Sequence, residues 1–369
     1  MLSGWALFRN GHAQNIFGTK GTPGVSVYKK RKLSWSPEMH LKPLNEQTIV
    51  ITGGSSGIGL ATAERAAREG ANVVIIARGE DALQKAASEV RTAGGRCDYV
   101  AADVTSREQV RTAVATIIER HGGFDTWVSD AGVAVYSKLE ELDDEDHRQV
   151  FETNYWGVVH CATEALPHLK KRGGALITMG SISSQMPAPL LSSYTASKYA
   201  VKGYIDSLRL ELMHEDAPVS ITLIQPSGIN TPFSKHALNE ADGRAQVPPP
   251  VYDPKIVAEA ICNAAEKPVR DMIVGGAGRA MTLLANLAPG LADHIFEKAF
   301  FATALRDQPK RKSDGGFHKS GAGGEIYGDQ NTGMRSTSLY TRMRMHPAAT
   351  AVALLAVAAG TAGLLKRKA

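Results

Sequence analysis

Tyr194 and Lys198 are the two residues whose types and spacing point most directly to chemistry. They are four positions apart among good helix formers, so on a helix they share one face about a turn apart. A free phenol has a pKa of about 10, but a fixed ammonium group nearby favours the phenolate and lowers that value. The pair is therefore a candidate acid–base couple, although the same spacing also occurs as ordinary decoration of amphipathic helices.

The composition bounds the class of protein. The 369 residues leave room for one α/β domain of about 230–250 residues plus extensions. The net charge of +5 is concentrated at the two ends, since residues 1–37 hold six Lys or Arg and no acid. The nearly neutral middle argues against a nucleic-acid surface there. Cys97, Cys161 and Cys262 have no metal or redox spacing, and we expect buried, reduced thiols of an intracellular protein.

Short apolar, β-branched runs alternate with helical patterns through the middle of the chain. Such near-continuous apolar strands are typical of parallel βαβ units, so the sequence predicts a single α/β domain with a doubly wound, Rossmann-type parallel sheet. Strands are predicted at 47–52, 72–77, 97–101, 126–129, 175–179, 219–224 and 271–274, and helices at 60–70, 80–93, from about 106 to 121, 144–169, 194–214 and 254–266.

The flanking segments carry weaker patterns. Residues 1–45 predict an irregular extension, which is open to interpretation as an organelle transit peptide or as a segment before a start at Met39. Residues 231–252 look like a mobile insertion. An apolar helical extension at 277–305 and a flexible linker at 306–346 are predicted to follow, with a possible membrane-anchoring helix with a basic end at 347–369.

The run Ala348–Leu365 contains 18 residues without a charged side chain. At 1.5 Å per residue it spans roughly 27 Å, just enough for a thin hydrocarbon core. A membrane-inserted or interfacial anchor and a soluble or oligomerising helix both remain open. The first predicts a cytoplasmic catalytic domain associated with a membrane, and the second a soluble cytoplasmic protein.

A glycine-rich turn follows the first predicted strand, as Gly53-x-x-x-Gly57-x-Gly59. Glycines in that turn let the backbone approach a pyrophosphate, which the helix N-terminus then stabilises. At the end of the second strand an acid binds the ribose 2′-hydroxyl of NAD, whereas an arginine accommodates the 2′-phosphate of NADP. The chain has Ala77-Arg78 there and lacks the acid, so NADP(H) is the expected cofactor.

Taken together, these motifs resemble the short-chain dehydrogenase/reductase superfamily from about residue 46 to 276. The resemblance rests on Thr52-Gly53-x-x-x-Gly57-x-Gly59, on the adenine-contacting pair Asp103-Val104, on Asn154, on Ser181 thirteen positions before Tyr194, on Tyr194-x-x-x-Lys198, and on Pro226-Ser227-Gly228-Ile229-Asn230-Thr231.

The resemblance implies hydride transfer between a nicotinamide and a carbonyl carbon. Tyr194 is then the acid or base, Lys198 lowers its pKa and binds the nicotinamide ribose, Ser181 binds the substrate oxygen, and Asn154 positions a water for a proton relay. Family resemblance also suggests a homodimer or homotetramer, and no metal ligands are predicted. The implied cofactor contacts are Gly53, Ser55, Ser56, Gly57, Ile58, Gly59, Arg78, Asp103, Val104, Ala131, Gly132, Tyr194, Lys198, Pro226, Ile229 and Thr231.

Two positions depart from the family pattern. Ser129-Asp130-Ala131-Gly132 stands where Asn-Asn-Ala-Gly is usual, so Asp130 loses an amide donor and can add a charge. Ser227 stands where glycine is common, which is a milder change.

The segment between Ser181 and Tyr194 contains Met186, Pro187, Leu190 and Leu191, which we expect to form an apolar pocket wall. The expected function is therefore hydride transfer between NADP(H) and a lipophilic ketone or secondary alcohol. The alternatives are a non-catalytic NADP(H)-binding sensor or scaffold on the same fold, and a dehydratase or epimerase.

Overall fold

The computed structural model describes residues 39–309, 316–330 and 333–352. Its centre is a seven-stranded sheet in the order β10-β7-β6-β4-β1-β2-β3, in which every neighbouring pair is parallel. The predicted doubly wound α/β fold is confirmed. The strands are β1 (Thr48–Thr52), β2 (Asn72–Ala77), β3 (Arg96–Ala101), β4 (Thr126–Ser129), β6 (Gly174–Met179), β7 (Val219–Pro226) and β10 (Asp271–Val274).

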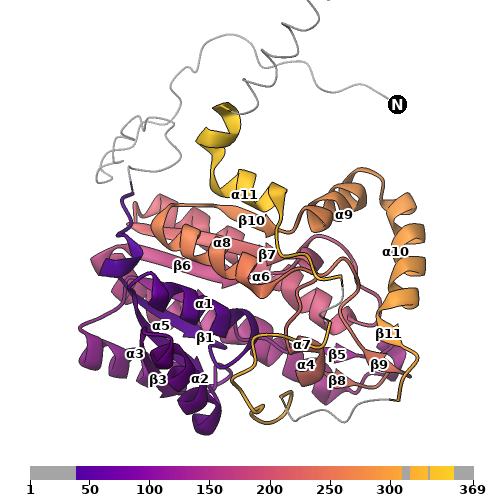
Figure 1. The fold of residues 1–369 in the computed structure, drawn as a ribbon, viewed down its shortest axis with the longest axis horizontal. Helices are drawn as coiled ribbons and strands as arrows, with labels where there is room; N and C mark the ends of the chain where they lie inside the picture. The colour runs from indigo at the N-terminus through magenta and orange to yellow at the C-terminus, as the bar shows by residue number, and fades with distance from the viewer. Residues whose placement is uncertain (1–38, 310–315, 331–332, 353–369) are drawn as a thin grey trace, which may run out of the picture. The chain divides into compact units, whose positions relative to one another are not determined.

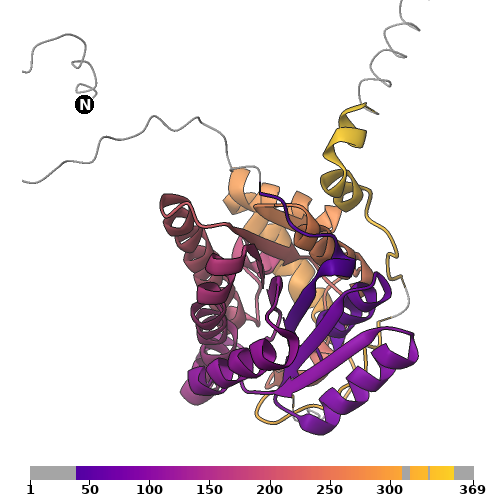
Figure 2. The ribbon, with the colours of Figure 1, turned by 90° about the vertical axis from the view of Figure 1, so that its left-hand side faces the viewer.

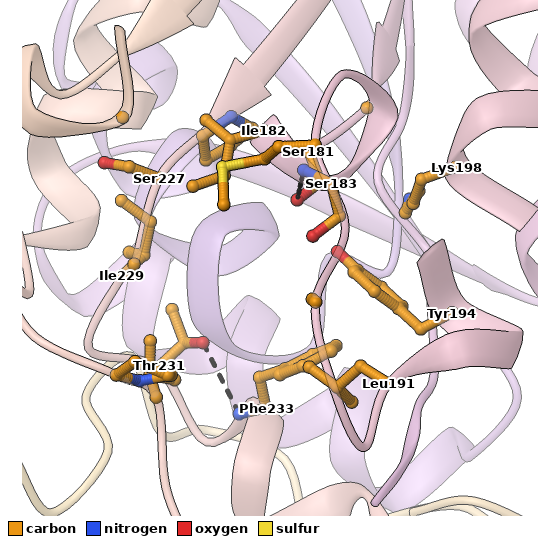
Figure 3. A pocket seen from close by; sticks show the side chains of 18 of the residues that line it. Ser181, Ile182, Ser183, Leu191, Tyr194, Lys198, Ser227, Ile229, Thr231 and Phe233 are labelled. Atoms are coloured by element: carbon orange, nitrogen blue, oxygen red, sulfur yellow. Dashed lines mark hydrogen bonds between the residues drawn. The ribbon is translucent and has the colours of Figure 1, made fainter. Parts of the chain in front are cut away.

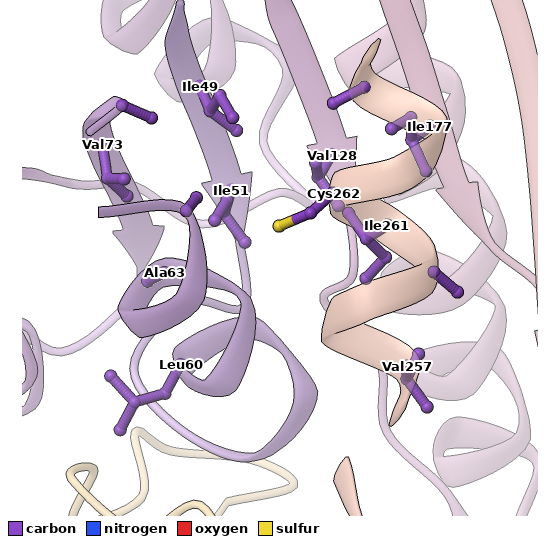
Figure 4. Packing of buried hydrophobic residues seen from close by; sticks show 14 of the residues in the cluster. Ile49, Ile51, Leu60, Ala63, Val73, Val128, Ile177, Val257, Ile261 and Cys262 are labelled. Atoms are coloured by element: carbon purple, nitrogen blue, oxygen red, sulfur yellow. The ribbon is translucent and has the colours of Figure 1, made fainter. Parts of the chain in front are cut away.

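Helices cover both faces of the sheet (Figures 1 and 2). The side chains of β1 alternate between the two layers, so Ile49 and Ile51 pack in one core cluster and Val50 in the other. Figure 4 shows the first cluster, where Val257 and Ile261 face the sheet from a helix. The helices of this face are α1 (Gly57–Arg68), α2 (Glu80–Thr92) and α8 (Pro254–Glu266); those of the other face are α3 (Arg107–His121), α5 (Gly157–Arg172) and α6 (Ser192–His214).

The strand order reverses between β1 and β4, because β2 and β3 lie on one side of β1 and β6, β7 and β10 lie beyond β4 on the other. In open α/β sheets a ligand crevice lies outside the carboxyl ends of the strands at such a switch point. The loops after β1, β2, β4, β6 and β7 therefore define where the site must be.

The predicted helix 144–169 is divided into three parts. A π-helical turn, Glu152–Trp156, separates α4 (Asp144–Phe151) from α5. Such turns are rare overall, and those that occur often lie at functional sites. This one contains Asn154.

Two segments expected to lie outside the packed domain, the insertion at 231–252 and the extension at 277–305, form regular elements in the structure. Residues 231–252 contain α7 (Phe233–His236), β8 (Leu238–Asn239), which pairs with β5 (Val135–Tyr136), and β9 (Arg244–Ala245), which pairs with β11 (Leu305–Arg306). The apolar extension forms α9 (Gly276–Leu287) and α10 (Pro289–Thr303), with the break at the predicted Pro289.

The flexible linker predicted at 306–346 is wrong for the residues that the structure describes there. Residues 316–325, here called the strap, bind along the loops after β1 and β2, and Phe317 is 1% exposed. Further on, α11 (Leu339–Met345) packs beside β10 and α8. The linker prediction failed because the hydrogen bonds between the strap and the loops after β1 and β2 join segments more than 200 positions apart and leave no local period.

Within the described ranges, no helix is long and apolar enough to cross a membrane. Most of the run Ala348–Leu365 lies outside them, as do residues 1–38. The three cysteines are buried and free, as expected, and burial raises the pKa of each thiol to about 12.

Candidate active site

Two neighbouring cavities open at the carboxyl ends of the strands. One, of about 190 Å³, contains Ser181, Tyr194 and Lys198. The other, of about 200 Å³, lies over the glycine turn and Arg78. The residues that line both cavities, and so join them, are Ile58, Asp130, Gly132, Thr231 and Phe233.

The glycine turn is shaped by close backbone approach. Gly53 has φ +72°, and a Cβ there would lie 2.9 Å from the main chain of Ala131. A Cβ on Gly59 would lie 2.4 Å from the carbonyl oxygen of Gly53. Side chains are thus excluded, and the N-terminus of α1 opens onto the second cavity, which suits a pyrophosphate.

The predicted cofactor residues gather around the two cavities. Asp103 is held by hydrogen bonds from the main-chain nitrogen and the hydroxyl of Thr105, both at 2.9 Å. Gly59 lies beneath the turn instead of lining a cavity. The second cavity is lined by Gly53, Ser55, Ser56, Gly57, Ile58, Arg78, Asp103, Val104, Ala131, Gly132 and Thr231, and the first by Ile58, Gly132, Tyr194, Lys198, Pro226, Ile229 and Thr231.

Ser181 and Tyr194 face each other across the first cavity. Ser181 begins a short 3-10 turn, and its hydroxyl accepts a hydrogen bond from the main-chain nitrogen of Ser183 at 3.0 Å. In Figure 3 the hydroxyl of Tyr194 points toward these serines. The Ser181 side chain acts on the phenol as a hydrogen-bond partner. Burial raises the pKa of Tyr194 to about 12, although the bond to Ser181 lowers it in part.

Lys198 lies one turn further along α6 and is buried. Its Nζ donates to the main-chain oxygen of Met179 at 2.8 Å. Burial lowers its pKa to about 8, while the nearby Asp130 raises it. The pKa of Tyr194 is raised in this structure because removal of the phenol from water is the largest effect on it, and the expected lowering by Lys198 stays a prediction.

Asn154 connects two parts of the site. Its Oδ1 accepts from the nitrogen of Val133 at 2.8 Å, and its Nδ2 donates to the oxygen of Val133 and to the hydroxyl of Ser197, each at 3.0 Å. This side chain therefore fixes the loop after β4 against the helix that carries Tyr194 and Lys198.

Asp130 is partly buried and lines both cavities. Burial raises its pKa to about 8, while Lys198 and a hydrogen bond from the Gly59 nitrogen lower it in part. When this carboxyl carries its proton it has one hydrogen-bond donor, which restores part of the donor capacity of asparagine. The other departure, Ser227, lines the first cavity and donates to the oxygen of Val274 at 2.9 Å.

The first cavity is mainly apolar. Of the four residues expected in its wall, Met186 and Leu191 line it, whereas Pro187 and Leu190 do not. Phe233, Met281 and Phe300 also line it and were missed, although Met281 and Phe300 belong to the apolar run that the sequence placed outside the domain. Only the fold shows that this run turns back onto the pocket.

Known proteins that are similar to this chain identify its family. A family model described as short chain dehydrogenase matches residues 47–242. The uncharacterized oxidoreductase YxnA of Bacillus subtilis is 38% identical over 329 residues, which are 88% of this chain and 92% of the relative. The chain belongs to the short-chain dehydrogenase/reductase family. The expected superfamily and the oxidoreductase class are thereby confirmed.

Other members carry more specific names. A 3beta-hydroxysteroid dehydrogenase of Mediterraneibacter gnavus is 32% identical over 194 residues, which cover 52% of this chain and 70% of the relative. An alcohol dehydrogenase of Thermococcus sibiricus, solved with 5-hydroxy-NADP, has a TM-score of 0.54 and 27% identity over 62% of this chain and 95% of its own. A family member of Burkholderia phymatum, solved with NAD, has a TM-score of 0.62 at 24% identity over 68% of this chain and 96% of its own, and shows the fold alone.

Proposed function

We propose that this dehydrogenase transfers a hydride between NADP(H) and a lipophilic ketone or secondary alcohol. One observation carries the proposal most: Ser181, Tyr194 and Lys198 meet at the point where an apolar cavity adjoins the cavity over the glycine turn. A hydrophobic carbonyl compound in the first cavity and a dinucleotide in the second would meet beside these side chains.

Each protein group has one task in this proposal. The nicotinamide, when bound, supplies or accepts the hydride at the substrate carbon. Ser181 donates a hydrogen bond to the carbonyl oxygen, and Tyr194 gives that oxygen a proton as the C–H bond forms, so a neutral alcohol results. Lys198 stabilises the phenolate that remains, and Asn154 keeps the loop at Val133 and helix α6 in register.

The choice of NADP(H) over NAD(H) depends on Arg78 and on the absence of an acid after β2. Solved relatives were obtained with NADP-type and NAD cofactors, so relatedness alone leaves the choice open. In direct binding, Arg78→Ala is expected to weaken NADPH about tenfold or more and to leave NADH within about twofold, as suits loss of a charge-assisted pair. A wild-type preference for NADH would contradict this part of the proposal.

The substrate class follows from the lining of the first cavity and from the name of the hydroxysteroid dehydrogenase relative. A panel of steroid, long-chain and sugar carbonyls tests it, with NADPH consumption as the readout. We expect turnover of the apolar compounds, and Met281→Asp is expected to abolish it while NADPH binding is retained. The exposed substitution Leu283→Asp on the same helix is the matched control. Preferred turnover of a sugar would contradict the substrate class, and a reaction without stoichiometric loss of NADPH would favour a dehydratase or epimerase.

Membrane association through Ala348–Leu365 and assembly into a dimer or tetramer stay predictions from the sequence. Deletion of residues 346–369 tests the first: the truncated chain is expected to lose its sedimentation with membranes. Equal sedimentation of the two chains would contradict the anchor. Light scattering of the purified protein tests the second.

A further inference from the structure

The strap, residues 316–325, binds the donors that a dinucleotide needs. At the N-terminus of α1, the main-chain nitrogen of Gly57 donates to the oxygen of Glu325 at 2.8 Å. Beside it, the nitrogen of Gly324 donates to the oxygen of Ser55, also at 2.8 Å. The strap is thus hydrogen-bonded to the phosphate-binding turn itself.

Arg78 is held by the same segment. Its Nη2 donates to the oxygens of Gly316 at 2.7 Å and of Lys319 at 2.8 Å, and its Nη1 donates to the oxygen of Phe317 at 3.3 Å. A guanidinium binds a phosphate through two parallel N–H groups on one of its edges. The two edges that can do so are formed by Nη1 with Nη2 and by Nε with Nη2, so both include Nη2. Because both hydrogens of Nη2 point to carbonyl oxygens, a bidentate grip on a 2′-phosphate requires Arg78 to leave the strap.

Besides these hydrogen bonds, the strap has one buried side chain that anchors it, Phe317. Phe317 packs with Val133, Val135 and Val150 in a small cluster apart from the main core. Two pairs, His318 with Asp146 at 3.2 Å and Lys235 with Glu325 at 2.9 Å, each include one side chain that is 56% exposed, and such pairs add little. Gly316, Ser320, Gly321 and Gly323 line the second cavity, so the strap stands directly over it.

We propose that the strap competes with the dinucleotide: it occupies Gly57 and Arg78 in the free protein and is displaced from them when NADP(H) binds. The inference rests on the proposed function, since it concerns how that cofactor gains its ligands. The apparent affinity for the cofactor is then the intrinsic affinity multiplied by the fraction of molecules in which the strap is open. This chain thereby tunes its cofactor affinity with a segment about 240 positions away from Arg78.

Hydrogen exchange of the full-length protein tests the displacement directly. We expect amides of peptides within 316–325 to exchange faster when NADPH is saturating than without it. Slower exchange there would overturn the proposal, because it would make the strap a wall that closes on the cofactor. Binding of NADPH is followed in the same samples by its fluorescence, so failure of the cofactor to bind is recognised as failure of the proposed function and of this inference together.

Phe317→Ala gives an independent test. Loss of the anchor opens the strap, and we expect NADPH to bind about tenfold more tightly or more, with faster association. The affinity for NADH is expected to rise less, because NADH uses the main-chain nitrogen of Gly57 but has no 2′-phosphate for Arg78 to bind. Leu339→Ala, at a side chain 75% exposed outside the strap, is the control and is expected to change neither affinity. Unchanged or weaker NADPH binding in a folded Phe317→Ala protein would overturn the competition, and an equal gain for NADH would overturn the part assigned to Arg78.

Discussion

The Nζ atom of Lys198 lies 5.7 Å from the centre of the Tyr194 ring. Lys198 directs its hydrogen bond to the oxygen of Met179, so we expect it to act on the phenol through its charge. That influence is present only while the ammonium is protonated. The titration of Lys198, coupled to that of Asp130, therefore determines how the pair responds to pH.

We predict that the kcat/KM of ketone reduction falls as pH rises through about 8. Burial lowers the pKa of Lys198 to about 8, so its charge is present below that pH and lost above it. The pKa of Tyr194 is raised to about 12, so the phenol keeps its proton throughout. Steady-state rates between pH 6 and pH 10 measure the midpoint.

Asp130→Asn is the matched variant for that profile. The Asp130 carboxylate raises the pKa of Lys198, so its removal is expected to move the midpoint to lower pH. A midpoint that stays in place or moves upward in the variant would contradict the assignment to Lys198.

Asp130 also makes a separate prediction about stability. Its pKa is raised to about 8 in the folded protein and is about 4 in the unfolded chain. Between these two pH values the native state therefore binds one proton more than the unfolded state. The free energy of unfolding therefore falls as pH rises through this window, by at most about 1.4 kcal/mol per pH unit for one proton. Urea unfolding at several pH values should show a flatter dependence in Asp130→Asn. Parallel curves for the two proteins would show that Asp130 does not titrate in this way.

Gly53→Ala should destabilise the protein more than Gly94→Ala. Both glycines have positive φ, +72° and +88°, but a Cβ on Gly53 would lie 2.9 Å from the Ala131 main chain, whereas nothing lies within 4 Å of one on Gly94. Gly94→Ala then carries only the backbone cost of roughly 1–2 kcal/mol, and Gly53→Ala adds a steric cost. Urea unfolding of both variants compares them, and equal losses would contradict the close approach at Gly53.

The sheet was predictable because each strand is a short apolar run and each parallel connection needs a helix. The gathering of Ser181, Tyr194 and Lys198 was predictable from spacing and family resemblance together. The electrostatics were not, because the pKa of Tyr194 depends on burial, which only the packed structure reveals.

The strap shows the other limit of the sequence. Around Phe317 the chain is rich in Gly, Lys and Ser, a composition typical of a linker. One buried aromatic ring and a set of main-chain hydrogen bonds hold it to loops far away in sequence. Hydrogen bonds to main-chain atoms leave little trace in the pattern of side chains, so the sequence does not reveal the partner of Gly57 or of Arg78.

The central claim is that Tyr194 transfers the proton that accompanies hydride transfer. Single-turnover reduction of a lipophilic ketone by NADPH, compared between the wild type and Tyr194→Phe, tests it most directly, with the NADPH dissociation constant measured alongside. The account predicts a rate lower by about 10²–10⁴-fold, typical of a lost general acid, with NADPH affinity within about twofold. A Tyr194→Phe protein that reduces the ketone at a rate close to that of the wild type would contradict it.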